Sequence, residues 1–201
     1  MFSNFFKKQT AIHRLNENKH KDVRHAIFND DVKKAFIDFV RLNTLSECML
    51  IGGVAVGVHS TARNTQDVDI IVLSENDIGK IYEDIKGKFR HPRPHSFEHK
   101  STGVEIEVLT PAVINYPKEI VDAAMKDAEV HDIDGHKIKV VSAKFLVVLK
   151  LKRANAKITK SHMDKFDITN LSEIYGKFDL SDLNLPKDEL EMYDDLTKHT
   201  K

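Results

Sequence analysis

One stretch, residues 49–73, limits what this chain can fold into more than any other. A short apolar run stops at Gly52-Gly53, aliphatic residues follow the glycines, and a second apolar run begins beside Asp67 and Asp69. The pattern predicts a strand, a glycine turn, a short helix and a second strand. Alternate side chains of a strand share a face, so the two carboxylates are expected side by side, roughly 7 Å apart along the backbone. Such a pair is suited to a hard divalent cation.

Gly52 and Gly53 indicate a second ligand, which is a phosphate group. A backbone without Cβ can approach a phosphate closely, and the N–H groups at the start of the following helix favour an anion. Metal-assisted phosphoryl transfer needs a phosphate-binding turn beside a carboxylate pair, because Mg²⁺ bridges carboxylates and nucleotide phosphates. The stretch therefore predicts a nucleotide site. The alternative is that the alternating acids only line the solvated face of a strand.

Together, the glycines and the acids resemble the signature of the nucleotidyltransferase (polymerase-beta-like) superfamily. Thirteen residues separate Gly53 from Asp67, and one apolar residue separates Asp67 from Asp69. The resemblance implies an α/β fold, with a small mixed β-sheet flanked by helices and a helical C-terminal part. The strands are expected near residues 48–52, 67–73, 91–98 and 103–109.

Two residues ahead of the acids indicate particular branches of this superfamily. The order Arg63-x-Thr65-x-Asp67-x-Asp69 is similar to the minimal and AbiEii-toxin-like branches of the superfamily. The resemblance implies that nucleotide binding involves Gly52, Gly53, Arg63 and Thr65. An AbiEii-like toxin inhibits growth and implies a partner protein, an antitoxin, that silences it.

Two-metal catalysis of the superfamily type needs a third carboxylate from a neighbouring strand. Residues 103–109 alternate between apolar and polar types, which predicts a strand with Glu105 and Glu107 on one face. Parity alone does not choose between the two glutamates. The resemblance favours Glu107, because the family acid precedes two apolar residues and a Thr-Pro pair such as Thr110-Pro111. The family more often has Asp at this position.

The resemblance resumes in two helical segments nearer the C-terminus. Lys150 lies in a very apolar segment, and Asp164 and Asp167 lie three residues apart in the next segment. In the family such a lysine contacts phosphates and such acids orient basic groups. The two acids share a helix face and a buried carboxylate needs a partner, so a salt bridge to Lys150 or Arg153 is expected. A snorkelling lysine and an aspartate bonded to nearby backbone are the alternatives.

Capping residues mark the helices that precede and follow the carboxylate strand. Asp30 or Asp31 is expected to cap a helix that ends near Asn43, and Ser74 or Asn76 to cap another.

Other short motifs predict turns and breaks. Residues 91–95, His-Pro-Arg-Pro-His, are expected to interrupt regular structure, and the prolines argue against a helical zinc site built from these histidines. Asp134-Gly135 predicts a hairpin with a type I′ turn. Pro117 is expected near a helix start.

Composition sets the outer limits. The chain has 201 residues, 41% of them hydrophobic and 31% charged, which predicts one globular domain. Within it we expect an N-terminal arm and helix (1–45), a nucleotidyltransferase core (46–141) and a C-terminal helical region (142–201). Thirty-one basic residues balance thirty-one acidic ones, so overall charge favours neither nucleic acid nor membrane. The basic stretch 135–165 can hold a triphosphate or RNA, or it can form a solvated helix face.

Cellular location follows from cysteine content and hydropathy. The single cysteine, Cys48, excludes an intramolecular disulfide, and no apolar run approaches the length of a membrane span. The N-terminus does not have the charge order of a signal peptide. A cytoplasmic protein without a membrane partner is therefore expected.

These features predict an Mg²⁺-dependent nucleotidyltransferase. Asp67, Asp69 and Glu107 are expected to hold two Mg²⁺ ions while an acceptor hydroxyl attacks an NTP and displaces pyrophosphate. RNA or tRNA is an expected acceptor, and neither the preferred NTP nor the oligomeric state follows from the sequence. The alternative is a catalytically degenerate nucleotide-binding or interaction module on the same fold, because Glu107 departs from the usual aspartate.

Overall fold

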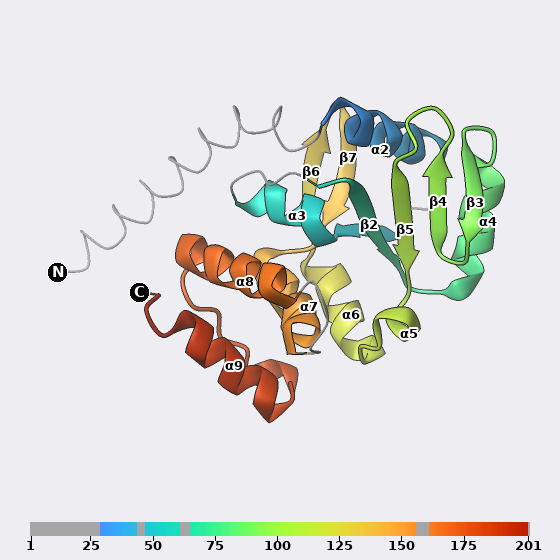
Figure 1. Ribbon diagram of the computed structural model, residues 1–201. Coiled ribbons are helices and arrows are strands. Elements are labelled where there is room, and N and C mark those ends of the chain that lie inside the picture. The colour runs from blue at the N-terminus through green and yellow to red at the C-terminus, as the bar shows by residue number, and fades with distance from the viewer. Residues whose placement is uncertain (1–28, 44–46, 61–64, 156–160, 201) are drawn as a thin grey trace.

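The computed structural model describes residues 29–43, 47–60, 65–155 and 161–200 of the chain (Figure 1). The described residues form a seven-stranded mixed sheet with the strand order β3-β4-β5-β2-β1-β7-β6. The strands are β1 (Cys48–Ile51), β2 (Asp67–Val72), β3 (Phe89–Arg93), β4 (Ser96–His99), β5 (Glu105–Leu109), β6 (Glu129–Ile133) and β7 (His136–Val140). The helices are α2 (Asp30–Leu42), α3 (Gly52–His59), α4 (Glu75–Ile85), α5 (Pro111–Ile114), α6 (Lys118–Asp127), α7 (Ala143–Asn155), α8 (Ser161–Tyr175), the short 3₁₀ helix η1 (Ser181–Leu183) and α9 (Lys187–Thr197).

The helices cover both faces of this sheet (Figure 1). Helices α2 and α4 contact each other and β2 on one face, whereas α3 contacts β1, β2, α7 and α8 on the other side. Helices α7, α8 and α9 pack on one another and form the predicted helical C-terminal part. The inward side chains of the central strands are almost fully buried, including Val68, Ile70 and Ile106. Burial of these branched side chains fixes the register of the sheet, because a one-residue slip exchanges its two faces.

Strand β2 lies at the centre and determines which residues meet. It runs antiparallel to β1 and parallel to β5, so Asp69 lies opposite Ile51 on one side and Glu107 on the other. Strand β7 runs parallel to β1, and the β6–β7 hairpin therefore extends the sheet beyond the expected strands. The hairpin turn matches its prediction, because Asp134 and Gly135 both have positive φ values, 53° and 79°.

The expectation for residues 91–98 was wrong in its details. In place of one strand near residues 91–98 interrupted at residues 91–95, β3 and β4 form an antiparallel pair that turns at His95, whose φ is 63°. Strand β3 includes Pro92 and forms an edge of the described sheet. An edge strand tolerates proline because one row of its N–H groups has no ladder partner to lose.

Helix ends follow the predicted positions with one correction. The cap of α2 is Asn29, whose Oδ1 accepts a hydrogen bond from the Val32 N–H at 2.8 Å, rather than Asp30 or Asp31. Both aspartates instead lie in the first turn, where they favour the positive end of the helix dipole. Of the two candidates Ser74 and Asn76, Ser74 caps α4, and Pro117 precedes α6.

Candidate active site

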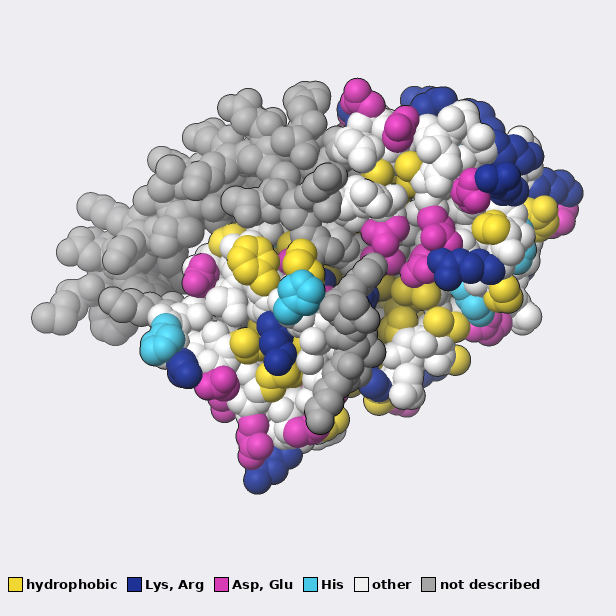
Figure 2. Space-filling view, viewed as in Figure 1, with side chains coloured by type: hydrophobic (Ala, Val, Ile, Leu, Met, Phe, Trp, Pro, Cys, Tyr) yellow, Lys and Arg dark blue, Asp and Glu magenta, His cyan; other side chains and the backbone are white. Residues whose placement is uncertain are grey.

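Two rows of side chains cross the sheet on the face that holds α3. In the first row Asp69 of β2 lies opposite Glu107 of β5, followed by Ser96 of β4 and Arg93 of β3. The second row lies two residues away along β2 and β5. It contains Asp67, Glu105, Glu98 and Arg90. Figure 2 shows acidic side chains gathered near the centre of this face, where β2 and β5 lie in Figure 1. We call these residues the acid rows.

Asp67 is held by a residue that precedes its strand. The Thr65 hydroxyl donates a hydrogen bond to the Asp67 carboxylate at 2.9 Å and also approaches the Asp67 carbonyl oxygen at 3.2 Å. Thr65 itself is buried. In this structure Thr65 therefore orients a carboxylate, whereas the sequence assigned it to the nucleotide.

The surroundings of Asp69 oppose a negative charge on its carboxylate. Burial raises its pKa from 3.8 to about 6, and repulsion from Asp67 and Glu107 adds to the effect. The positive charges of Arg153 and Lys150 on helix α7 oppose this rise. A carboxylate with a raised pKa among other acids gains most from a bound cation.

Gly52 makes room for the Asp69 carboxylate. A Cβ built on Gly52 would lie 1.8 Å from Asp69 Oδ2, and Gly52 has a φ of +70°, where L side chains are strained. Both observations explain glycine at this position without any ligand. Gly53 lies buried in the first turn of α3, whose N-terminus has no side-chain cap. The phosphate role of the two glycines stays a prediction.

A chain of polar contacts fixes the two glutamates of β5. The Arg93 guanidinium contacts Glu105 Oε1 through Nε at 2.9 Å and Glu107 Oε1 through Nη2 at 3.0 Å. The Ser96 hydroxyl also donates to Glu105 Oε1. This hydrogen bond and the Arg93 contacts hold the pKa of Glu105 below its usual value. Glu105 is thus engaged by Ser96 and Arg93, whereas Glu107 lies beside Asp69.

Lys150, Asp164 and Asp167 form a buried ion cluster between α7 and α8. Lys150 Nζ lies 3.0 Å from Asp164 Oδ1 and 2.7 Å from Asp167 Oδ2. Arg153 Nε lies 3.3 Å from Asp164 Oδ2. The predicted salt bridges to Lys150 and Arg153 are therefore present, and they join the two helices.

Arg63 lies outside the described residues, so its predicted role in nucleotide binding stays a prediction. Among the described part of the chain, no three His, Cys, Asp or Glu side chains are gathered as a ready metal cluster. The donor set of Asp67, Asp69 and Glu107 nevertheless fits Mg²⁺, since it offers only carboxylate oxygens. Burial and then repulsion from Asp67 and Glu107 raise the pKa of Asp69, and a cation would offset both effects.

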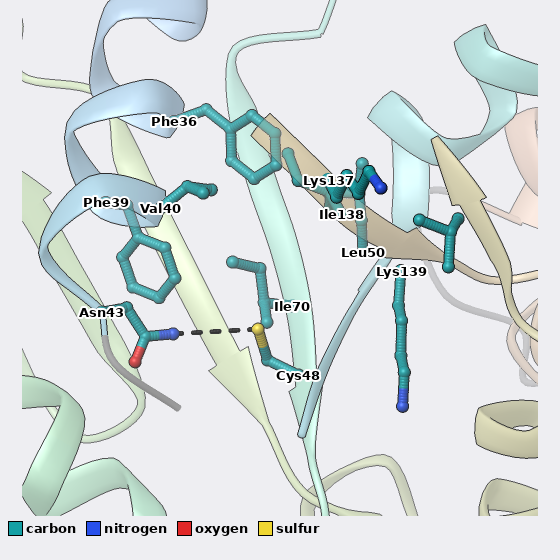
Figure 3. A pocket seen from close by; sticks show the side chains of 11 residues that line it. Phe36, Phe39, Val40, Asn43, Cys48, Leu50, Ile70, Lys137, Ile138 and Lys139 are labelled. Carbon is teal, nitrogen blue, oxygen red and sulfur yellow. Dashed lines mark hydrogen bonds between the residues drawn. The ribbon is translucent and has the colours of Figure 1, made fainter. Parts of the chain in front are cut away.

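A cavity of about 370 Å³ lies on the opposite face of the sheet, beneath α2 (Figure 3). Phe36, Phe39, Leu50 and Ile70 give it an apolar wall, and Asn43 donates a hydrogen bond to Cys48 Sγ at 3.7 Å. Because Leu50 and Ile70 alternate with Ile51 and Asp69, this cavity does not open onto the acid rows.

Arg93 and Ser96 escaped the sequence prediction. The sequence predicted a strand near residues 91–98 but also a break at residues 91–95, so neither side chain was assigned to a face of the sheet. The available signal was the pair of arginines at 90 and 93 ahead of a short alternating segment, which is typical of a charged edge strand.

No helix in the described ranges is long and apolar enough to cross a membrane. No protein-family model and no curated protein matches this sequence. Among solved structures, the chain is similar to an antigenic nucleotidyltransferase-like protein from Paracoccidioides brasiliensis, with a TM-score of 0.61 at 17% identity. That match covers 86% of this chain and 90% of the other.

A second match is to the lincosamide antibiotic adenylyltransferase LnuA in its lincomycin-bound form, with a TM-score of 0.46 at 15% identity. It covers 73% of this chain and 98% of the other. The first likeness shows that this chain has the α/β nucleotidyltransferase fold that its sequence predicted.

Proposed function

We propose that this protein is a metal-dependent nucleotidyltransferase that moves a nucleotide from an NTP to an acceptor hydroxyl and releases pyrophosphate. The observation that carries the proposal is the position of Asp69, which lies between Asp67 and Glu107 and directly beside the Gly52 turn. Acids and a helix N-terminus meet there on a fold that nucleotidyltransferases use. Fold alone does not imply function, so the argument depends on these residues.

Each group has a proposed task. Asp67, Asp69 and Glu107 hold Mg²⁺, which when bound neutralises phosphate charge and lowers the pKa of the attacking hydroxyl. The uncapped N–H groups of α3 face the phosphates, and Lys150 and Arg153 add positive charge on the α7 side. Arg63, Thr65, Asp164 and Asp167 complete the proposed nucleotide site, with Thr65 acting through Asp67 and the two acids through Lys150.

The transfer balances as an in-line substitution. The acceptor oxygen forms a bond to the α-phosphorus, and the bond from that phosphorus to the bridging oxygen of the β-phosphate breaks. Pyrophosphate leaves with the electron pair, and the proton of the hydroxyl passes to water. The protein contributes position and charge, which are the main sources of catalysis in phosphoryl transfer.

For the acceptor we propose RNA or tRNA, with an antitoxin as the silencing partner of an AbiEii-like toxin. This part rests on the Arg63-x-Thr65 motif ahead of the acids. It is tested by incubating the protein with each α-labelled NTP, Mg²⁺ and total RNA, and then with protein and small-molecule acceptors. We expect label in RNA with wild-type protein and none with Asp69→Asn. Label only in a small molecule refutes the RNA acceptor, and nucleotide binding without transfer to any acceptor supports the degenerate module.

A further inference from the structure

Arg93 is the one basic side chain among the described residues that contacts Glu107. It comes from β3, two strands away from β5, and its side chain is 57% exposed, so core packing does not explain its position. Its guanidinium reaches across β4 to lie between Glu105 and Glu107. Figure 2 shows a basic side chain beside the central acids on this face.

Arg93 is anchored more firmly to Glu105 than to Glu107. Both Nε and Nη2 approach Glu105 Oε1, whereas only Nη2 approaches Glu107. Glu105 in turn accepts the Ser96 hydroxyl, and Ser96 is buried. The contacts form a chain from the Ser96 hydroxyl to Glu105, from Glu105 to Arg93, and from Arg93 to one oxygen of Glu107. Residues that hydrogen-bond a metal-binding side chain in this way typically orient it toward the metal.

We propose that Arg93 is a positioning residue that holds Glu107 by Oε1 so that its other carboxylate oxygen can bind the metal next to Asp69. Glu105, fixed by Ser96, is the tether of Arg93 and not a metal ligand. The inference rests on the proposed function, because it assigns the metal to Asp67, Asp69 and Glu107. It also explains how a glutamate serves at this position, since its longer side chain has one more rotatable bond than aspartate and needs an anchor.

Charge and geometry predict opposite effects for removal of Arg93. If the arginine acts only as a positive charge near the site, Arg93→Gln removes repulsion and strengthens cation binding. If it positions Glu107, Arg93→Gln weakens cation binding, by about 10–100-fold for a support behind a metal ligand. Arg93→Lys separates the two explanations further, because lysine keeps the charge but lacks the planar fork that reaches both glutamates.

The test measures Mn²⁺ binding to the whole protein without nucleotide, by calorimetry and by electron paramagnetic resonance. We expect Arg93→Gln, Arg93→Lys and Glu105→Gln each to weaken Mn²⁺ binding by about 10–100-fold. The matched control is Arg90→Gln on the same strand, since Arg90 pairs with Glu98 and not with Glu107. Thermal unfolding of each variant checks that the fold persists.

A second comparison uses the length of the metal-binding side chain. In a Glu107→Asp background, the shorter acid no longer reaches Arg93, so adding Arg93→Gln is expected to cost less than threefold. Unchanged or stronger Mn²⁺ binding by Arg93→Gln overturns the inference when wild-type protein binds Mn²⁺ and Asp69→Asn does not. Equal Mn²⁺ binding by wild-type protein and Asp69→Asn overturns the metal site itself, and with it both the proposed function and this inference.

Discussion

Two charged clusters of the described chain differ in how their charges are balanced. Between α7 and α8, Lys150 and Arg153 face Asp164 and Asp167, so each carboxylate has a basic partner from the protein. Across the sheet, the acid rows hold five carboxylates against two arginines, an excess of three negative charges. The charged members of the acid rows are Asp67, Asp69, Glu98, Glu105, Glu107, Arg90 and Arg93.

The difference indicates two kinds of role. A balanced and buried cluster holds elements together, because removal of either sign leaves an uncompensated charge. An unbalanced cluster at a partly open surface gains a counter-charge when a cation binds, and without one the pKa of Asp69 is raised by burial and by its acidic neighbours. The α7–α8 cluster thus joins two helices through its own ion pairs, whereas the acid rows keep a net negative charge that a cation can offset.

The largest expected effect is on the balanced cluster. Lys150→Met leaves Asp164 and Asp167 without their shared lysine, and we expect a loss of about 3–5 kcal/mol in the free energy of unfolding. Lys144→Met is the matched control, because Lys144 lies on the same helix and pairs with the exposed Asp182. The control is expected to cost less than about 1 kcal/mol. Equal urea unfolding curves for the two variants contradict the structural role of the cluster.

The unbalanced cluster is expected to respond in the opposite direction. Asp69→Asn removes a proposed metal ligand, and transfer should fall by at least about a hundredfold. Without metal, the same change removes repulsion and should stabilise the protein at pH 8 by about 1–2 kcal/mol, a value reduced for partial exposure. Both effects are measurable, by labelled transfer and by urea unfolding in the presence of a chelator.

The sign of the pH dependence follows from the pKa of Asp69. Its value of about 6 in the folded protein exceeds the ordinary 3.8, so the folded state binds more protons between these values. Wild-type stability therefore falls as pH rises from about 4 to about 6, and the penalty is fully present above that range. The advantage of Asp69→Asn should be present at pH 8 and absent at pH 3.5. A constant advantage across this range contradicts the assignment.

Gly52→Ala is expected to have an intermediate effect. A methyl group there meets the Asp69 carboxylate and also strains the backbone at φ +70°, so we expect a loss of about 2 kcal/mol in stability and a loss of metal binding. Gly79→Ala is the control, since its Cβ meets nothing within 4 Å in helix α4. The control should stabilise the protein by up to about 1 kcal/mol. Normal metal binding by Gly52→Ala contradicts this prediction, because it shows that the Asp69 carboxylate can move away from the added methyl group.

Thr65→Val is expected to have the smallest effect. It removes the hydrogen bond to the Asp67 carboxylate while it keeps the shape of the side chain, so transfer should fall by about tenfold and stability by about 1 kcal/mol. Thr169→Val on α8 removes a hydroxyl that bonds only the Lys165 carbonyl oxygen, among the contacts described. It should leave transfer unchanged. Equal transfer by both variants contradicts the orienting role of Thr65.

The sequence predicted which acids of the candidate site share a face, because the signals for that are local. Alternation put Asp67 with Asp69, and Glu105 with Glu107, on common strand faces, and a three-residue spacing put Asp164 and Asp167 on one helix face. The register that brings Glu107 beside Asp69 is a pairing of distant strands, and no local pattern specifies it. The choice of Glu107 as a metal ligand remains a prediction.

The rest of the fold depended on features that single-sequence patterns do not carry. Strand β3 contains Pro92, which argues against a strand unless the strand is known to lie at an edge. The parallel pairing of β7 with β1 depends on packing across the whole sheet. The sequence therefore predicted the β6–β7 hairpin but not its place in the sheet. Arg93 was missed for the first of these reasons, because the break expected at residues 91–95 left its side chain without a predicted face.

The strand order also has a consequence for the order of synthesis. Five neighbouring strands, β3-β4-β5-β2-β1, come from residues 48–109, whereas β7 reaches its partner β1 only after residue 136 has been made. Until then one edge of β1 exposes unpaired backbone groups, which is the kind of edge that recruits other chains. Long-range parallel pairing is also slow to form. We therefore expect a nascent chain that ends near residue 125 to contain paired acid rows and an aggregation-prone β1 edge, which the hairpin later covers.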